Sequence, residues 1–181
     1  DGTGANPMYE PETNTYFAYI RVHGLPPQEL AGLAGGSPEM YPGRRSVGLA
    51  RTKDFFNWPP PKLVLFPDPQ DAPDISFYGG FYFPYPDRKD LHCMLVHVFH
   101  QITGTVDSQI AFSHDGIIWY RPEHRAIIPT GPMGSGFEGG LYSQGGLLEL
   151  PDGYWGIPFC GKTGQHNGFH HDGTESPSPA Q

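Results

Sequence analysis

The sequence predicts an all-β protein of the β-propeller class, and two observations carry this prediction. Residues 48–58 align without a gap on residues 109–119, with alanine, hydroxyl, aspartate and tryptophan recurring 61 positions apart. A fixed period of this kind indicates a repeat architecture, and a four-stranded blade takes roughly 40–50 residues, more with long loops. The 25 glycines, 21 prolines and 14% aromatic residues are typical of many short strands joined by turns.

Each copy of the repeat begins with a predicted strand. Residues 46–51 and 108–113 alternate small or apolar side chains with polar ones, as a half-buried strand does. A short apolar strand is expected after each copy, at 62–66 and at 125–128. The repeat therefore predicts the third and fourth strands of two successive blades.

A tight polar turn separates those two strands in each copy. Asp54 and Asp115, each with a hydroxyl residue before it, can accept hydrogen bonds from the backbone of their own turn. Trp58 and Trp119 follow and close each hairpin. We interpret all four residues as structural, because turn formers and packing aromatics account for them.

Three further hairpins share a turn that begins with proline and continues with an acidic or polar residue. The turns start at Pro11, Pro86 and Pro151, and an apolar strand lies on each side of every turn. These would be the two inner strands of each blade. The expected units are a first blade at 1–66, a second at 67–129, an incomplete third at 130–160, and a polar loop or tail at 161–181.

Two and a half blades do not close a ring, and an open ring exposes apolar blade faces. We therefore expect this chain to be a piece of a longer propeller, whose remaining blades are its partners. Closure by assembly with other copies of the chain is the alternative. Five blades at this period would need roughly 300 residues.

Charge and composition exclude some classes of function. The net charge of −8, with no basic patch, argues against nucleic acid as a partner. No apolar run is long enough to cross a membrane, so we expect no membrane partner, and no signal peptide is visible. The compartment stays open between secreted, periplasmic and cytoplasmic. Cys93 and Cys160 lie in apolar strands, where buried free thiols are expected and a disulfide is the alternative.

Three carboxylates are predicted to meet on the axis of the propeller. Asp1, Asp74 and Glu138 each lie 10 to 13 residues before a turn proline, where an innermost strand begins on the upper face. Converging carboxylates suit glycoside hydrolysis, because one donates a proton to the leaving oxygen and another acts as base or nucleophile. Crowding of like charges separates their pKa values. Acidic residues also begin strands as turn formers, which is the structural alternative.

The same geometry places further side chains on the upper face. Strands that end or begin there can present sugar-binding groups, and aromatic rings can stack on a sugar face. The expected substrate-binding residues are Arg45, Tyr78, His100, Asp107, Gln109 and Tyr142.

Together these motifs resemble the five-bladed β-propeller glycoside hydrolases near families 32, 43 and 117. The resemblance rests on residues 44–58, on Asp74-Ile75-Ser76-Phe77-Tyr78, on residues 107–119 and on Gly136-Phe137-Glu138-Gly139-Gly140, and it covers nearly all of residues 1–160. It implies that Glu138 is the acid, that Asp74 is the auxiliary carboxylate or the base, and that Asp1 is the base. The Trp-x-Asn-Asp-Pro and Arg-Asp-Pro patterns of such enzymes are missing, so sugar and stereochemistry are not implied.

The predicted function is a glycoside hydrolase acting on a polysaccharide or oligosaccharide in the axial cavity. The alternatives are a non-catalytic carbohydrate-binding propeller, which would tolerate loss of Glu138, and a propeller that binds partners through its outer surface. No cofactor is expected. His97 and His100 would lie on opposite faces of a strand, which is poor metal-ligand geometry, and no residue demands a structural calcium.

Overall fold

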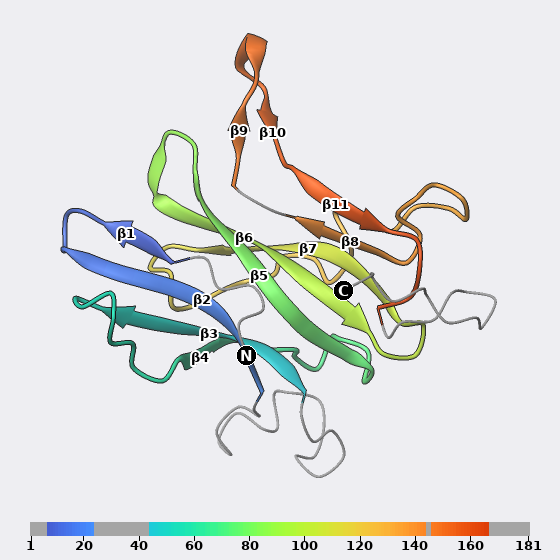
Figure 1. Ribbon diagram of the computed structural model, residues 1–181, viewed down its shortest axis with the longest axis horizontal. Helices are drawn as coiled ribbons and strands as arrows, with labels where there is room; N and C mark the ends of the chain where they lie inside the picture. Colours follow the sequence, from blue (N-terminus) through green and yellow to red (C-terminus); the bar gives the residue numbers. More distant parts are fainter. Residues whose placement is uncertain (1–6, 24–43, 144–145, 167–181) are drawn as a thin grey trace.

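The computed structural model describes residues 7–23, 44–143 and 146–166, and this part of the chain is all-β, as predicted (Figure 1). The first sheet is antiparallel and follows chain order. Its strands are β1 (Met8–Glu10), β2 (Thr15–His23), β3 (Arg45–Thr52) and β4 (Lys62–Leu65).

The second sheet is larger and has the order β11-β8-β7-β6-β5. Its antiparallel part comprises β5 (Ile75–Tyr85), β6 (Arg88–His100) and β7 (Thr105–Ser113). The strand β8 (Gly140–Ser143) joins β7 in parallel through one pair, Val106 with Gly140, and β11 (Phe159–Lys162) pairs with β8. A hairpin of β9 (Leu148–Glu149) and β10 (Trp155–Gly156) projects beyond both sheets (Figure 1).

The three predicted proline turns form the predicted hairpins, β1–β2, β5–β6 and β9–β10. Each turn places an asparagine or aspartate in the left-handed region, Asn14 at φ 51°, Asp87 at φ 61° and Asp152 at φ 69°, and Gly153 at φ 76° follows Asp152 in the third turn. Asparagine and aspartate tolerate this conformation better than other residues with a Cβ. The shared turn chemistry seen in the sequence therefore corresponds to a shared backbone geometry.

The repeated turns after β3 and β7 are also equivalent. The Asp54 carboxylate accepts the N–H of Phe56 at 3.0 Å, and the Asp115 carboxylate accepts the N–H groups of Ile117 and Ile118 at 2.8 Å. Each tryptophan donates its indole N–H to a carbonyl three residues earlier. The structural interpretation of these aspartates and tryptophans is confirmed.

The strand β6 forms the centre of the core. Its buried residues Cys93, Met94, Leu95, Val96 and Val98 face both sides of the sheet in alternation. One side packs against the first sheet, and the other side packs against Leu147 and Ile157. These two residues lie in the segment from β8 to β11, which we call the third unit. The Tyr19 hydroxyl of β2 donates to the Gly116 carbonyl at 2.7 Å, which ties the first sheet to the repeated turn of the second.

Two expectations differ from the structure. Residues 125–128 do not form a regular strand, and an isolated bridge, Ser108–Ile128, joins this segment to β7, while a second bridge, Phe112–Tyr120, lies before it. Pro122 and Pro129 flank it and have no N–H to donate to a ladder. Cys93 is buried as expected, whereas Cys160 is exposed because β11 lies at the edge of its sheet, and both thiols are free.

No described sheet closes on itself. The described part of the chain also holds no helix with the length and hydropathy that a membrane crossing requires. The strand β11 continues past the expected boundary at residue 160 and ends at Lys162.

Removing the Tyr19 hydroxyl tests the connection between the first two sheets. Tyr19→Phe should lower the free energy of unfolding by about 1 kcal/mol, because a buried hydrogen bond to the Gly116 carbonyl is lost. Urea unfolding measures this change. Tyr9→Phe is the matched control, since its hydroxyl bonds Asn14 at the surface. Equal effects of the two substitutions would contradict a stabilising role for the buried contact.

Candidate functional site

Strand register brings four of the predicted site residues, Asp74, His100, Asp107 and Glu138, to one end of the second sheet. Ile75 pairs with His100, His100 pairs with Thr105, and Val106 pairs with Gly140. Asp74, Asp107 and Glu138 are each within two residues of these paired positions. We call this end the upper end. Asp1 lies outside the described residues.

Asp74 stabilises the connection between β6 and β7. Its carboxylate accepts the N–H of Ile102 at 3.2 Å, and its carbonyl accepts the N–H of Gln101 at the same distance. Arg44 holds the start of β5 from the first sheet, because its Nε donates to the Ile75 carbonyl at 2.7 Å. Asp74 is thus fixed in position, with a carboxylate that remains partly accessible.

Glu138 lies in the loop before β8 and bonds to that loop. Its own N–H lowers the pKa of its carboxyl, and the N–H groups of Gly134 and Gly136, at 3.3 and 2.9 Å, act in the same direction. A general acid at neutral pH needs a raised pKa instead. In the described part of the chain, no hydrogen bond links the Glu138 and Asp74 carboxylates.

The glycine after Glu138 has a packing reason. A Cβ at Gly139 would lie 2.0 Å from the carbonyl oxygen of Gly164, in the segment after β11. The backbone of this strand start therefore approaches another backbone more closely than a side chain allows.

The three strand units contribute side chains to one aromatic and cationic cluster near the upper end, which we call the upper cluster. It is built around Tyr78, the residue at a β-bulge of β5, between the paired positions of Phe77 and Gly79. Bulges re-aim side chains and occur next to functional sites. The members of the upper cluster are Arg21, Arg45, Tyr78, His97, Phe99, Tyr142 and His166.

Contacts in the upper cluster are close. The guanidinium carbons of Arg21 and Arg45 lie 4.8 and 5.1 Å from the centre of the Tyr78 ring. The His166 ring lies 4.1 Å from that of Tyr78, and its Nδ1 shares a 2.6 Å hydrogen bond with the Tyr142 hydroxyl. Two of the predicted sugar-stacking residues, Tyr78 and Tyr142, are therefore brought together with the predicted Arg45.

Both histidines of the upper cluster are uncharged at neutral pH. Burial lowers the pKa of His97 from its ordinary value of 6.5 to about 4. Its Nε2 accepts the backbone N–H of Ser143 at 3.1 Å, as only the unprotonated nitrogen can. Burial also lowers the pKa of His166 to about 4, and the nearby cations Lys162, Arg45 and Arg21 act in the same direction.

His100 and Asp107 form a pair on the opposite face of β6 from His97, as the strand geometry predicted. The His100 Nε2 lies 2.7 Å from the Asp107 carboxylate, and this hydrogen bond raises the pKa of His100. The side chains are 28% and 16% exposed, so a ligand could reach them from solvent.

Gln109 lies elsewhere, in a buried polar network. Its side-chain carbonyl accepts a hydrogen bond from Arg121 at 2.9 Å, and Arg121 also pairs with the fully buried Asp71 and with Asp68. His124 contacts Asp68 at 2.8 Å. The Asp68, Asp71 and His124 ligand atoms are close enough to hold a cation, but Arg121 already supplies the positive charge there. Gln109 is consequently not available to a sugar in this structure.

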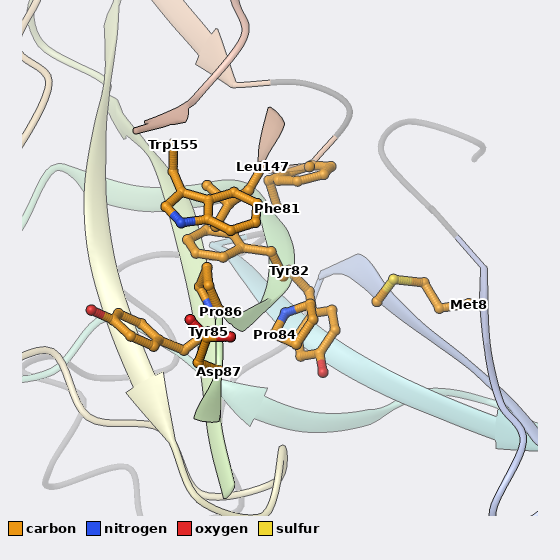
Figure 2. Close-up of a pocket in the computed structure, with 11 residues that line it drawn as sticks. Met8, Phe81, Tyr82, Pro84, Tyr85, Pro86, Asp87, Leu147 and Trp155 are labelled. Carbon is orange, nitrogen blue, oxygen red and sulfur yellow. The ribbon is translucent and has the colours of Figure 1, made fainter. Parts of the chain in front are cut away.

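A cavity of about 790 Å³ lies at the other end of β5, beside the β5–β6 turn. Figure 2 shows Trp155, Leu147 and Phe81 gathered on one side of it, with Met8 on the other. Its lining is largely apolar, and none of the predicted site residues contributes to it. We therefore place the candidate site at the upper end, where the ionisable and hydrogen-bonding groups are.

Three members of the upper cluster, Arg21, Phe99 and His166, were not among the site residues predicted from the sequence. Arg21 was a detectable signal, because it is a charged residue inside an otherwise apolar strand. Phe99 could not be distinguished from the other apolar residues of β6. His166 lies beyond the last strand, and no motif surrounds it.

Comparisons with known proteins do not place this chain in a family. No protein-family model matches the sequence, and no curated protein matches it with a significant score.

Replacing Arg121 tests the buried network. Arg121→Met should lower the free energy of unfolding by about 3–5 kcal/mol, because the Asp71 carboxylate is left buried without a cation. Arg88→Met is the matched control, since Arg88 pairs with Asp90 at the surface and its loss should change stability little. Chemical denaturation measures both. A small effect at Arg121 would show that Asp71 is adequately solvated without it.

His97 predicts a pH dependence of stability. Its folded-state pKa of about 4 lies below the ordinary 6.5, so the unfolded chain binds more protons between these values. Stability is fully present above pH 6.5 and is lost as the pH falls toward 4. His97→Gln should reduce the loss between pH 7 and pH 5 by about 2 kcal/mol, measured by urea unfolding at both pH values. His114→Gln, at an exposed position, should leave the loss unchanged.

Proposed function

We propose that the first sheet, the β5–β7 part of the second sheet and the segment from β8 to β11 are successive blades of a five-bladed β-propeller, and that the protein is a glycoside hydrolase. Three features support the propeller: the four-stranded first sheet in chain order, the repeated hairpins, and the burial of the second unit between its neighbours. On this proposal β1 and β5 are inner strands that run along the axis.

One observation supports the carbohydrate function most strongly, namely the meeting of all three units at the upper cluster. Tyr142 is a half-buried aromatic ring on which a sugar can stack, and Arg45, which lies over the neighbouring Tyr78 ring, offers hydrogen-bond donors beside it. Asp74 and Glu138 lie at the same end of the sheet. A sugar bound on the rings would thus lie near carboxylates from two blades.

Hydrolysis needs one carboxyl group that is protonated and one that is ionised. We propose Glu138 as the acid and Asp74 or Asp1 as the base or auxiliary carboxylate. The loop amides of Gly134 and Gly136 favour ionised Glu138 in the free protein. A bound sugar would therefore have to displace these amides before Glu138 could carry a proton.

The second candidate is a carbohydrate-binding propeller without catalysis. The lowered pKa of Glu138 favours it, because an ionised carboxylate that caps its own loop performs no acid catalysis. In this case the upper cluster alone would account for function.

Replacement of the carboxylates separates the two candidates. We expect Glu138→Gln and Asp74→Asn to lower hydrolysis of polysaccharides and aryl glycosides by about 100-fold or more while sugar binding persists. Glu149→Gln is the control, because Glu149 lies exposed on the β9–β10 hairpin. Binding is measured by calorimetry and hydrolysis by release of reducing sugar.

Unchanged hydrolysis in the Glu138 variant would overturn its assignment as the acid. Sugar binding without turnover by the unaltered protein would favour the non-catalytic candidate. Absence of both binding and turnover across the panel would contradict the carbohydrate function.

A further inference from the structure

Among the described residues of the upper cluster, Arg45 is the one with a buried side-chain nitrogen that has no hydrogen-bond partner. Its guanidinium lies against the rings of Tyr78 and Phe99, at 5.1 and 5.5 Å from their centres. Its Nε atom is buried and has no hydrogen-bond partner, and no carboxylate of the described residues pairs with this side chain. A buried charged donor without a partner is costly, so the structure pays a penalty at this position.

The acidic groups at the upper end are engaged elsewhere. Asp107 contacts His100, Asp74 accepts the N–H of Ile102, and Glu138 accepts N–H groups of its own loop. None of these carboxylates neutralises Arg45. An acceptor for the Arg45 Nε atom would therefore come from outside the described residues.

The surroundings of Arg45 are positively charged. The guanidinium of Arg21 lies over the same Tyr78 ring, 4.8 Å from its centre. Lys162 and both arginines contribute, after burial, to the lowered pKa of His166, which shows a local positive potential. This positive charge is local to the cluster, in a chain whose net charge is −8.

We propose that the upper cluster binds an acidic sugar, with the anionic group of that sugar on Arg45 and its ring against Tyr142. The proposal rests on the carbohydrate function proposed above and specifies its substrate class. Arginine suits this role because its planar fork donates two parallel hydrogen bonds to a carboxylate or a sulfate. A uronate and a sulfate ester offer the same chemistry, and the experiment distinguishes them.

The chemistry argues against a neutral sugar at this position. Hydroxyl groups bring no charge to offset the half-buried guanidinium of Arg45, and neutral acceptors form weaker bonds with it than anions do. The Arg45 guanidinium lies near two aromatic rings, Tyr78 and Phe99, which limits its orientations and favours a fixed anionic group.

Matched pairs of oligosaccharides test the proposal by calorimetry. The uronate pairs are oligogalacturonate and oligoglucuronate, each with its carboxyl-reduced counterpart. The sulfate pairs are κ-carrageenan and chondroitin sulfate oligosaccharides, each with its desulfated counterpart. We expect the acidic member of at least one pair to bind about tenfold or more tightly than its neutral counterpart, and the difference to shrink as salt is added.

Variants locate the effect. Arg45→Gln should remove the preference for the acidic member, and Arg45→Lys should restore part of it. Arg51→Gln is the matched control, because Arg51 lies on the same strand but at its far, exposed end, next to Phe17. Should Arg45→Gln fail to fold, the salt dependence of the unaltered protein remains as the test.

Each outcome is decisive. Equal or tighter binding of the neutral members would overturn the acidic-sugar proposal and leave the carbohydrate function standing. Binding of no sugar in any pair would overturn both. An acidic preference that survives Arg45→Gln would place the anion elsewhere and contradict the assignment to Arg45.

Discussion

The burial of β6 on both faces is the constraint on which the rest of the structure depends. Met94, Val96 and Val98 face the first sheet, while Cys93 and Leu95 face the third unit. Both faces of β6 are therefore covered only while the first sheet and the third unit stay packed against it. This packing on both faces of β6 determines where β2 and β3, and β8 and β11, lie relative to β5.

The upper cluster is a consequence of the same packing. Arg21 and Arg45 come from the first sheet, Tyr78 from the second, and Tyr142 from the third unit. These side chains meet because each lies near the same end of its unit, and the β5 bulge turns Tyr78 toward the others. Side chains that belong to separate units of the chain thus converge at one end of the structure.

The sequence predicted the hairpins well because their causes are local. The proline turns and the repeated Asp–Trp turns contain their own hydrogen-bond donors and acceptors, so the residues alone indicate the geometry. The segment 125–128 failed as a strand because flanking prolines outweigh its apolar pattern. The upper end was predicted from strand direction, whereas Gln109 was misplaced because its partner Arg121 comes from a loop with no recognisable motif.

The three tryptophans are distributed so that each unit carries its own optical reporter. Trp58 lies in the turn of the first sheet, Trp119 is buried where the first and second sheets meet, and Trp155 is 46% exposed on the β9–β10 hairpin. Because Trp119 contacts Tyr19, its emission depends on the contact between the first two sheets. Intrinsic fluorescence of variants that keep one tryptophan can therefore follow separation of the units, one at a time, without any added label.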